Sequence, residues 1–286
     1  MRYLENAFKF TFKNFLLTLP LLISLAIPAL IINIGTAGFV TQLTHKYMGM
    51  LQDMIQGQYY GFDANFFDGM ITAPMIVSVV IGGLLTLVFS LLAYPATYGF
   101  ISRQYDTGNA TLSDFTACMS KYIGRYVLYI LLRIAIGLGM GIVLAILIAV
   151  SGIIMAFASN AFGIILMILF YLAFIVAVIA LRVYMCLWFP AICTEGCGVT
   201  DGLKLSFKTV NGSFWPLLGI TILISICGSI ISSILGIFPF VGAVVSSVAS
   251  TLAWIITTVY YFEVYRGKTG RFYNPEGFRQ INDTIQ

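Results

Sequence analysis

Two arginines interrupt long apolar stretches and are the ionisable residues best placed to do chemistry. Arg133 and Arg182 each lie about two helical turns from the end of a stretch that is otherwise nearly free of charge. Charge inside a membrane-spanning helix is costly and often marks a binding or transport site. In one interpretation, both face the interior of a helix bundle, pair with Glu263 or Glu195, and bind an anionic headgroup or substrate. In the other, each buries its methylene groups and extends its guanidinium to the phosphates at the membrane surface.

The sequence lacks the residue patterns typical of enzymes and metal centres. It has no Walker A loop, no Gly-x-Ser-x-Gly and no His-Glu-x-x-His, and a single histidine, His45, excludes most histidine-based catalysis. Cys193 and Cys197 are close enough to suggest a metal site, but no further Cys or His pair completes a tetrahedral set. We therefore expect five reduced cysteines, no metal, no cofactor and no enzyme activity. Nothing in the sequence suggests nucleic-acid binding.

The composition is that of a membrane protein. Of the 286 residues, 60% are hydrophobic and only 9% are charged, whereas about 25% of residues are charged in a soluble globular domain. Even a large soluble core would need a more ionisable surface than 15 basic and 11 acidic residues provide. Many apolar side chains must therefore face lipid.

Six stretches are long and apolar enough to cross a hydrocarbon core of about 30 Å, which needs around 20 residues per helix. Charge within each stretch is absent or confined to one end. The alternating polarity of a β-barrel strand is missing. The stretches are 15–40, 75–101, 126–150, 162–190, 214–235 and 240–264.

The short connections give the orientation, because lysine and arginine are enriched in cytoplasmic loops. If the N-terminus is cytoplasmic, the outer connections carry a single basic residue, Lys46. The inner segments carry Arg2, Lys9, Lys13, Arg103, Lys121, Arg125, Lys204, Lys208, Arg266, Lys268, Arg271 and Arg279. We therefore predict a multi-pass protein of the cell membrane with both termini in the cytoplasm.

The outer connection at 41–74 is the only one long enough to carry an extracellular function. Its Asp63 and Asp68 could bind a cation or an external peptide, although an acidic loop is usually only solvated. Four apolar or aromatic residues early in this connection recur at helical spacing and predict a short helix lying on the outer interface. They are Tyr47, Leu51, Met54 and Ile55.

A weak internal repeat is present on the predicted inner side. The segments 5–15, 112–126 and 201–214 each combine an acidic start, basic residues toward the end and an aromatic residue where a span begins. Acid near the start of a helix and base near its end suit the helix dipole. The segments 102–108 and 265–270, which close the first and third repeats, also resemble each other. Each repeat therefore predicts an amphipathic helix followed by a transmembrane hairpin.

The predicted fold is thus an all-α polytopic membrane protein with six transmembrane helices. They form three hairpins, each preceded by a cytoplasmic interfacial helix, within a single transmembrane domain over residues 1–286. The pseudo-repeats are 1–110, 111–198 and 199–286. All three have the same orientation, unlike the inverted repeats of many secondary transporters. Small residues four apart, such as Gly137 with Gly141 and Gly228 with Ser232, predict close helix packing.

Part of the chain resembles a known family. The stretches 187–195 (LWFPAICTE), 198–218 (GVTDGLKLSFKTVNGSFWPLL) and 260–266 (YYFEVYR) are similar to a bacterial family of uncharacterised six-helix integral membrane proteins. That family is related to the membrane domain appended to some glycerophosphodiester phosphodiesterases. The resemblance implies no catalytic residues, and this chain has no room for the soluble phosphodiesterase barrel.

These observations favour a non-enzymatic protein of the bacterial inner, or cytoplasmic, membrane that organises or supports other membrane components. Its expected partners are membrane lipids, with other membrane proteins or a homo-oligomer as further candidates. Candidate contacts for an anion or lipid headgroup are Arg133, Arg182, Glu263, Lys204 and Lys208. The alternative function is a small transporter or export component with a path between the hairpins.

Overall fold

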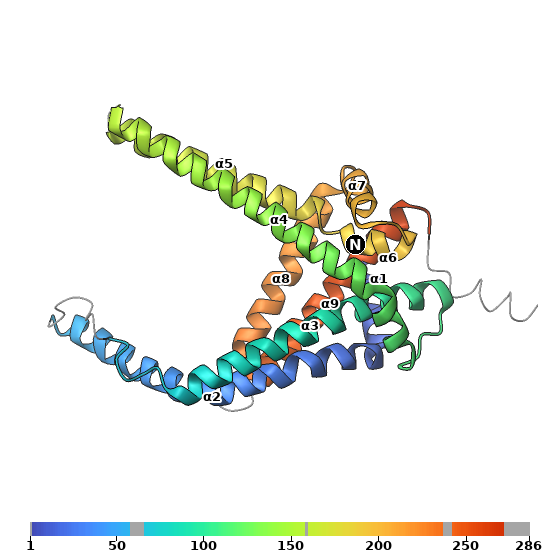
Figure 1. The fold of residues 1–286 in the computed structure, drawn as a ribbon, viewed down its shortest axis with the longest axis horizontal. Helices are drawn as coiled ribbons and strands as arrows, with labels where there is room; N and C mark the ends of the chain where they lie inside the picture. Colours follow the sequence, from blue (N-terminus) through green and yellow to red (C-terminus); the bar gives the residue numbers. More distant parts are fainter. Residues whose placement is uncertain (1, 58–65, 158–159, 237–241, 272–286) are drawn as a thin grey trace, which may run out of the picture. The chain divides into compact units, whose positions relative to one another are not determined.

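The computed structural model describes residues 2–57, 66–157, 160–236 and 242–271, and within these ranges every regular element is a helix. The predicted all-α class is therefore confirmed over this part of the chain. In chain order (Figure 1) the elements are α1 (Arg2–Lys13), η1 (Phe15–Thr18), α2 (Leu19–Ile55), α3 (Ala73–Thr107), α4 (Asp114–Phe157), α5 (Asn160–Tyr184), α6 (Trp188–Glu195), α7 (Val199–Val210), α8 (Phe214–Gly236) and α9 (Gly242–Lys268).

Six helical segments in the described chain are long and apolar enough to cross a membrane. The shortest of them, α8, has 23 residues. At 1.5 Å per residue it measures about 34 Å, slightly more than a hydrocarbon core of about 30 Å. The chain is therefore a multi-pass integral membrane protein, as the lengths of the apolar stretches predicted.

Two segments expected to form separate surface helices are continuous with long helices instead. The residues at helical spacing after the first span continue α2 as far as Ile55. Likewise, α4 begins at Asp114, so most of the segment 112–126 forms the first turns of a candidate span. Neither segment contains a proline that would interrupt the helix. Asp63, in the connection after α2, lies outside the described residues.

The fourth apolar stretch, predicted over 162–190, is broken before its end. α5 ends at Tyr184, and α6 begins at Trp188 after a short turn. In an uninterrupted helix the ring of Pro190 would clash with the carbonyl of Cys186, four residues earlier. As the third residue of α6, Pro190 avoids this clash, because the chain has already turned. Pro190 thus accompanies a break between α5 and α6.

The chain divides into two compact units. Unit 1 comprises Met1–Leu17, Pro95–Ile224 and Ile256–Gln286, and unit 2 comprises Thr18–Tyr94 and Ser225–Ile255. The boundaries fall within η1, α3, α8 and α9, so each of these helices contributes a segment to both units. They do not coincide with the boundaries of the predicted pseudo-repeats.

The short helix α6 is the most deeply buried element of unit 1, with every residue from Trp188 to Thr194 buried. It packs against α7, where a methyl group on Gly202 would overlap Ile192. The indole nitrogen of Trp188 donates a hydrogen bond to the carbonyl of Val199 over 2.6 Å. The ring of Tyr129, from α4, meets the Trp188 ring edge to face at 4.9 Å between centroids. Aromatic contacts and one strong hydrogen bond therefore fix α6.

The helices α4 and α5 form the longest hairpin of unit 1 and lie side by side (Figure 1). Their outward positions carry exposed aliphatic side chains along most of their length, including Leu138, Ile142, Ile168 and Leu172. In water such a surface would drive association, but a lipid environment accepts it. Among the predicted packing positions, Gly137 and Gly141 have open space where a side chain would be.

In unit 2 the helices approach closely at small residues. A methyl group on Gly35 of α2 would overlap Ser78 of α3. On the α8 and α9 segments, the hydroxyls of Ser232 and Ser250 are hydrogen-bonded at 2.9 Å, and a methyl group on Gly228 would come within 2.7 Å of Ala253. The prediction of close packing is confirmed for Gly228 and Ser232, in contrast to Gly137 and Gly141.

Candidate functional site

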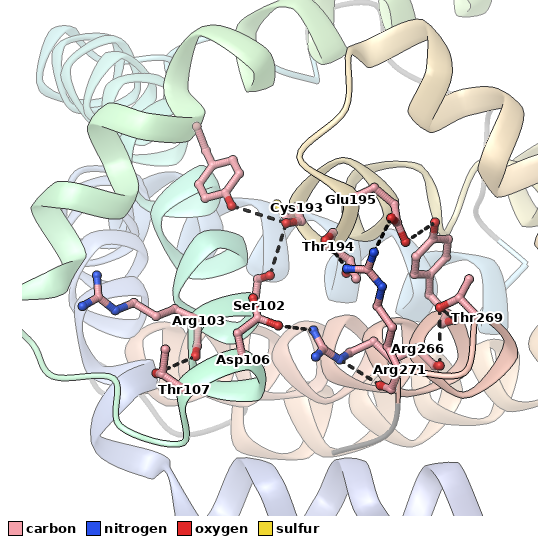
Figure 2. A network of polar contacts seen from close by, with 12 residues as sticks. Ser102, Arg103, Asp106, Thr107, Cys193, Thr194, Glu195, Arg266, Thr269 and Arg271 are labelled. Atoms are coloured by element: carbon pink, nitrogen blue, oxygen red, sulfur yellow. Dashed lines mark hydrogen bonds and ion pairs between the residues drawn. The ribbon is translucent and has the colours of Figure 1, made fainter. Parts of the chain in front are cut away.

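The most highly connected polar region of unit 1 joins the C-terminal ends of α3, α6 and α9 (Figure 2). At its centre, Nη1 of Arg266 donates to Oδ1 of Asp106 over 2.8 Å. The Arg266 side chain is only 8% exposed, whereas that of Asp106 is 51% exposed. The guanidinium also lies over the Tyr105 ring, 5.2 Å from its centroid. An arginine so deeply buried is retained only with close partners, which the carboxylate and the ring provide.

A second ion pair follows directly from the end of α9. Gly270 adopts a positive φ of 77°, which lets the chain reverse and brings the Arg271 amide to the Arg266 carbonyl at 2.8 Å. The Arg271 side chain then reaches α6, where Nη2 pairs with Oε2 of Glu195 at 2.8 Å and Nη1 donates to the Thr194 carbonyl at 3.1 Å. Arg271 therefore links the ends of α9 and α6.

The third group in this region is the carboxylate of Glu263, on α9. The Tyr105 hydroxyl donates to its Oε1 over 2.8 Å, and the Asn6 amide donates to its Oε2 over 3.4 Å. Nearby, the hydroxyls of Ser102 and Tyr122 both donate to the Cys193 carbonyl, over 3.3 and 3.4 Å. These hydrogen bonds connect α1, α3, α4, α6 and α9. We call the residues that make these ion pairs and hydrogen bonds the polar network: Asn6, Ser102, Tyr105, Asp106, Tyr122, Cys193, Thr194, Glu195, Glu263, Arg266 and Arg271.

The groups of the polar network are arranged to hold helix ends together. Asp106 and Glu195 are each paired with an arginine, and Glu263 accepts hydrogen bonds from a phenol and an amide. Among the described residues, no group of three His, Cys, Asp or Glu side chains is placed to hold a metal ion. In the turn between α6 and α7, burial raises the pKa of the Cys197 thiol, which disfavours a nucleophilic thiolate at neutral pH.

The arginines proposed from the sequence lie elsewhere and are exposed. Arg133 extends from α4, and its Nη1 donates to the Tyr129 hydroxyl over 3.2 Å. Arg182 lies in the last turn of α5. Among the described contacts, the expected carboxylate partners are engaged by other groups: Glu195 by Arg271 and Glu263 by Tyr105 and Asn6. The pairing hypothesis is not supported, and exposure suits the alternative in which the guanidinium groups reach the membrane surface.

The remaining predicted residues also divide between the interior and the surface. Lys204 and Lys208 are exposed on α7, and Lys204 lies 3.5 Å from the carboxylate of Asp201. Glu263 alone among the candidates belongs to the polar network. Asp68 is exposed in the turn before α3.

Sequence reasoning missed the ion pairs because Arg266 and Asp106 are 160 residues apart. One signal could have found them. The segments 102–108 and 265–270 resemble each other at the ends of two predicted repeats, and the Arg266–Asp106 pair joins these same two segments. Both segments end in a glycine with positive φ, Gly108 and Gly270. The two similar segments thus end in the same way, at a glycine with positive φ, and they contact each other through this ion pair.

Over the described residues, the fold and the polar network define an all-α, multi-pass integral membrane protein in which ion pairs join helix ends. No family model, no curated protein and no solved structure matches this chain.

Proposed function

We propose that this chain is a non-enzymatic protein of a bacterial inner membrane that organises or supports other membrane components. It does so through lipid or protein contacts on a basic cytoplasmic face. Both termini are cytoplasmic in this proposal, and the spans form three hairpins. These are α2 with α3, α4 with the span that contains α5 and α6, and α8 with α9. The family resemblance of the stretches 187–195, 198–218 and 260–266 is part of the proposal.

The observation that carries this function is the division of charged groups between interior and surface. The deeply buried Arg266 is compensated by Asp106 within the protein. In contrast, Arg133, Arg182, Lys204 and Lys208 are exposed. Groups with internal partners stabilise the fold, whereas exposed basic groups are available to anionic headgroups or to acidic surfaces of other proteins.

The arrangement of the described polar groups also favours a supporting role over catalysis. A nucleophile must lie within hydrogen-bond reach of a base that activates it. The described contacts of Glu195 and Glu263 are instead with arginine, tyrosine and asparagine groups. Such contacts hold helices together and do not activate a nucleophile.

The experiment that tests this function is purification of the full chain in native lipid discs, with bound lipids and proteins identified by mass spectrometry. The variant combines Arg133→Gln, Arg182→Gln, Lys204→Gln and Lys208→Gln. Lys46→Gln is the matched control, because Lys46 is a basic residue on the predicted outer side. We expect the parent and the control to retain the same set of anionic lipids or membrane proteins, and the variant to lose it. An unchanged set in the variant would contradict the proposal.

A further inference from the structure

The inward face of α1 is partly polar, and its polar groups are satisfied. Thr11 is buried and donates to the Ala7 carbonyl over 2.8 Å, and Asn14, which follows the helix, accepts from the Gln104 amide over 3.3 Å. Phe10 is on this same side of the helix and stacks on the Tyr105 ring at 4.5 Å between centroids. These contacts, with the Asn6 bond to Glu263, fix which side of α1 faces the protein.

The outward face of α1 is unusual because it is aromatic as well as charged. Phe8 and Phe12, one helical turn apart on α1, are 38% and 68% exposed, and Phe15, at the start of η1, is 40% exposed. The Phe8 and Phe12 rings stack on each other at 6.3 Å between centroids. Lys9 and Lys13, also exposed, alternate with these rings, and Lys9 Nζ pairs with Oε1 of Glu5 at 2.6 Å on the surface. We call these five residues the Phe–Lys face.

Neither water nor a transmembrane position explains this face. A helix in contact with water places its apolar side chains inward, whereas here three phenylalanines point outward. With 12 residues, α1 is about 18 Å long, too short to cross a core of about 30 Å. Aromatic rings next to lysines are typical of a helix in the membrane surface, with rings below the headgroups and ammonium groups at the phosphates.

The position of α1 in the chain brings it close to the membrane. Only residues 14–18 separate it from α2, the first candidate span. Five residues reach at most about 17 Å even when fully extended. The helix therefore lies within reach of the headgroup layer, and its basic residues Arg2, Lys9 and Lys13 outnumber the acidic Glu5. Charge complementarity selects anionic lipid over a neutral lipid surface.

We propose that the Phe–Lys face inserts into the cytoplasmic leaflet and selects anionic phospholipid headgroups. This inference rests on the cytoplasmic orientation in the proposed function, and it identifies anionic phospholipid as the partner of this face. Lys9 and Lys13 act at the phosphates, and the phenylalanines hold the helix in the layer beneath them.

Site-specific photocrosslinking in the full chain tests this inference. Phe12 is replaced by p-benzoylphenylalanine, and the protein is reconstituted in lipid discs that mix zwitterionic and anionic phospholipids. After illumination, adducts are identified by mass spectrometry. We expect phospholipid adducts in which anionic species are enriched several-fold over their share of the disc. Lys9→Gln with Lys13→Gln should remove the enrichment while leaving lipid adducts in place, because the rings remain inserted.

The matched control places the same photocrosslinker at Phe67, an exposed aromatic residue in the turn before α3. The two lysine substitutions should leave its adducts unchanged. Crosslinks from position 12 to a second copy or to another protein would overturn the inference, and so would lipid adducts without anionic enrichment. Either result is distinguishable from failure of the proposed function, since the latter is measured on variants of α4, α5 and α7 with α1 intact.

Discussion

The core around α6 and the outer part of the α4–α5 hairpin are both apolar, yet they meet different surroundings. Trp188 and Leu187 in the core are completely buried, whereas Leu138 on α4 is 66% exposed. In the core, protein atoms complete the packing of each side chain. Along the hairpin, lipid chains do so, and lipid is as apolar as leucine. The difference teaches that apolar sequence alone does not indicate which side chains stabilise this fold.

The largest expected effect in this comparison comes from Trp188→Ala. This change removes the 2.6 Å hydrogen bond to Val199 and the contact with the Tyr129 ring. We expect a loss of about 3–5 kcal/mol in the free energy of unfolding, the usual range for a buried aromatic truncated to alanine. The measurement is equilibrium unfolding in mixed detergent micelles.

Trp215→Ala is the matched control for this change, because Trp215 is 77% exposed at the start of α8. Its effect should stay within about 0.5 kcal/mol. Equal losses for the two tryptophans would show that the α6 core does not differ from the exposed surface in stability.

An intermediate effect is expected from Arg266→Met, which removes the guanidinium that pairs with Asp106 but keeps an apolar side chain of similar length. Breaking a fully buried ion pair costs about 3–5 kcal/mol. Asp106 is half-exposed and regains water, so the loss here should be smaller, about 1–3 kcal/mol.

A double-mutant cycle with Asp106→Asn measures the coupling between the two residues directly. We expect a coupling of at least about 0.5 kcal/mol, as for residues in contact. Lys268→Met, at an exposed lysine two residues further along α9, serves as the control. Strictly additive effects of the Arg266 and Asp106 substitutions would contradict the assigned contact.

The smallest effect is expected from Leu138→Ala on the exposed side of α4. Since this side chain has few protein neighbours to lose, the unfolding free energy should change by less than about 0.5 kcal/mol. Leu217→Ala, at a completely buried leucine of α8, should cost about 2–5 kcal/mol in the same assay. Similar losses at both leucines would mean that Leu138 is covered by protein and not by lipid.

The apolar segments were predictable because twenty apolar residues in succession satisfy a simple length requirement. Helix ends were less predictable. The stretch predicted over 162–190 is broken before Pro190, and whether a proline kinks or breaks a helix here depends on the packing of α6 against α4 and α7, which local sequence does not encode. The continuation of α2 to Ile55 agrees with the helical spacing of Tyr47 and Leu51, and only the expected break before them was wrong.

The polar network was mostly beyond prediction, because its contacts join residues far apart in sequence. The sequence singled out Arg133 and Arg182 for their unusual apolar surroundings, yet both lie outside this network. Arg266 lies in a segment with other charged residues, so the local sequence does not distinguish it as a site residue. Its burial depends on Asp106 and Tyr105, which lie on another helix. Glu263 was predicted as a site residue, but its partners were not.

The separation between Asp106 and Arg266 also implies a delay between the synthesis of the two residues. A ribosome that adds about 5–20 residues per second needs roughly 8–32 seconds to proceed from the first residue to the second. During that interval Asp106 has no access to Arg266, and Glu195, made about halfway through it, has no access to Arg271. The ends of α3 and α6 therefore lack these ionic partners until the end of α9 has been synthesised.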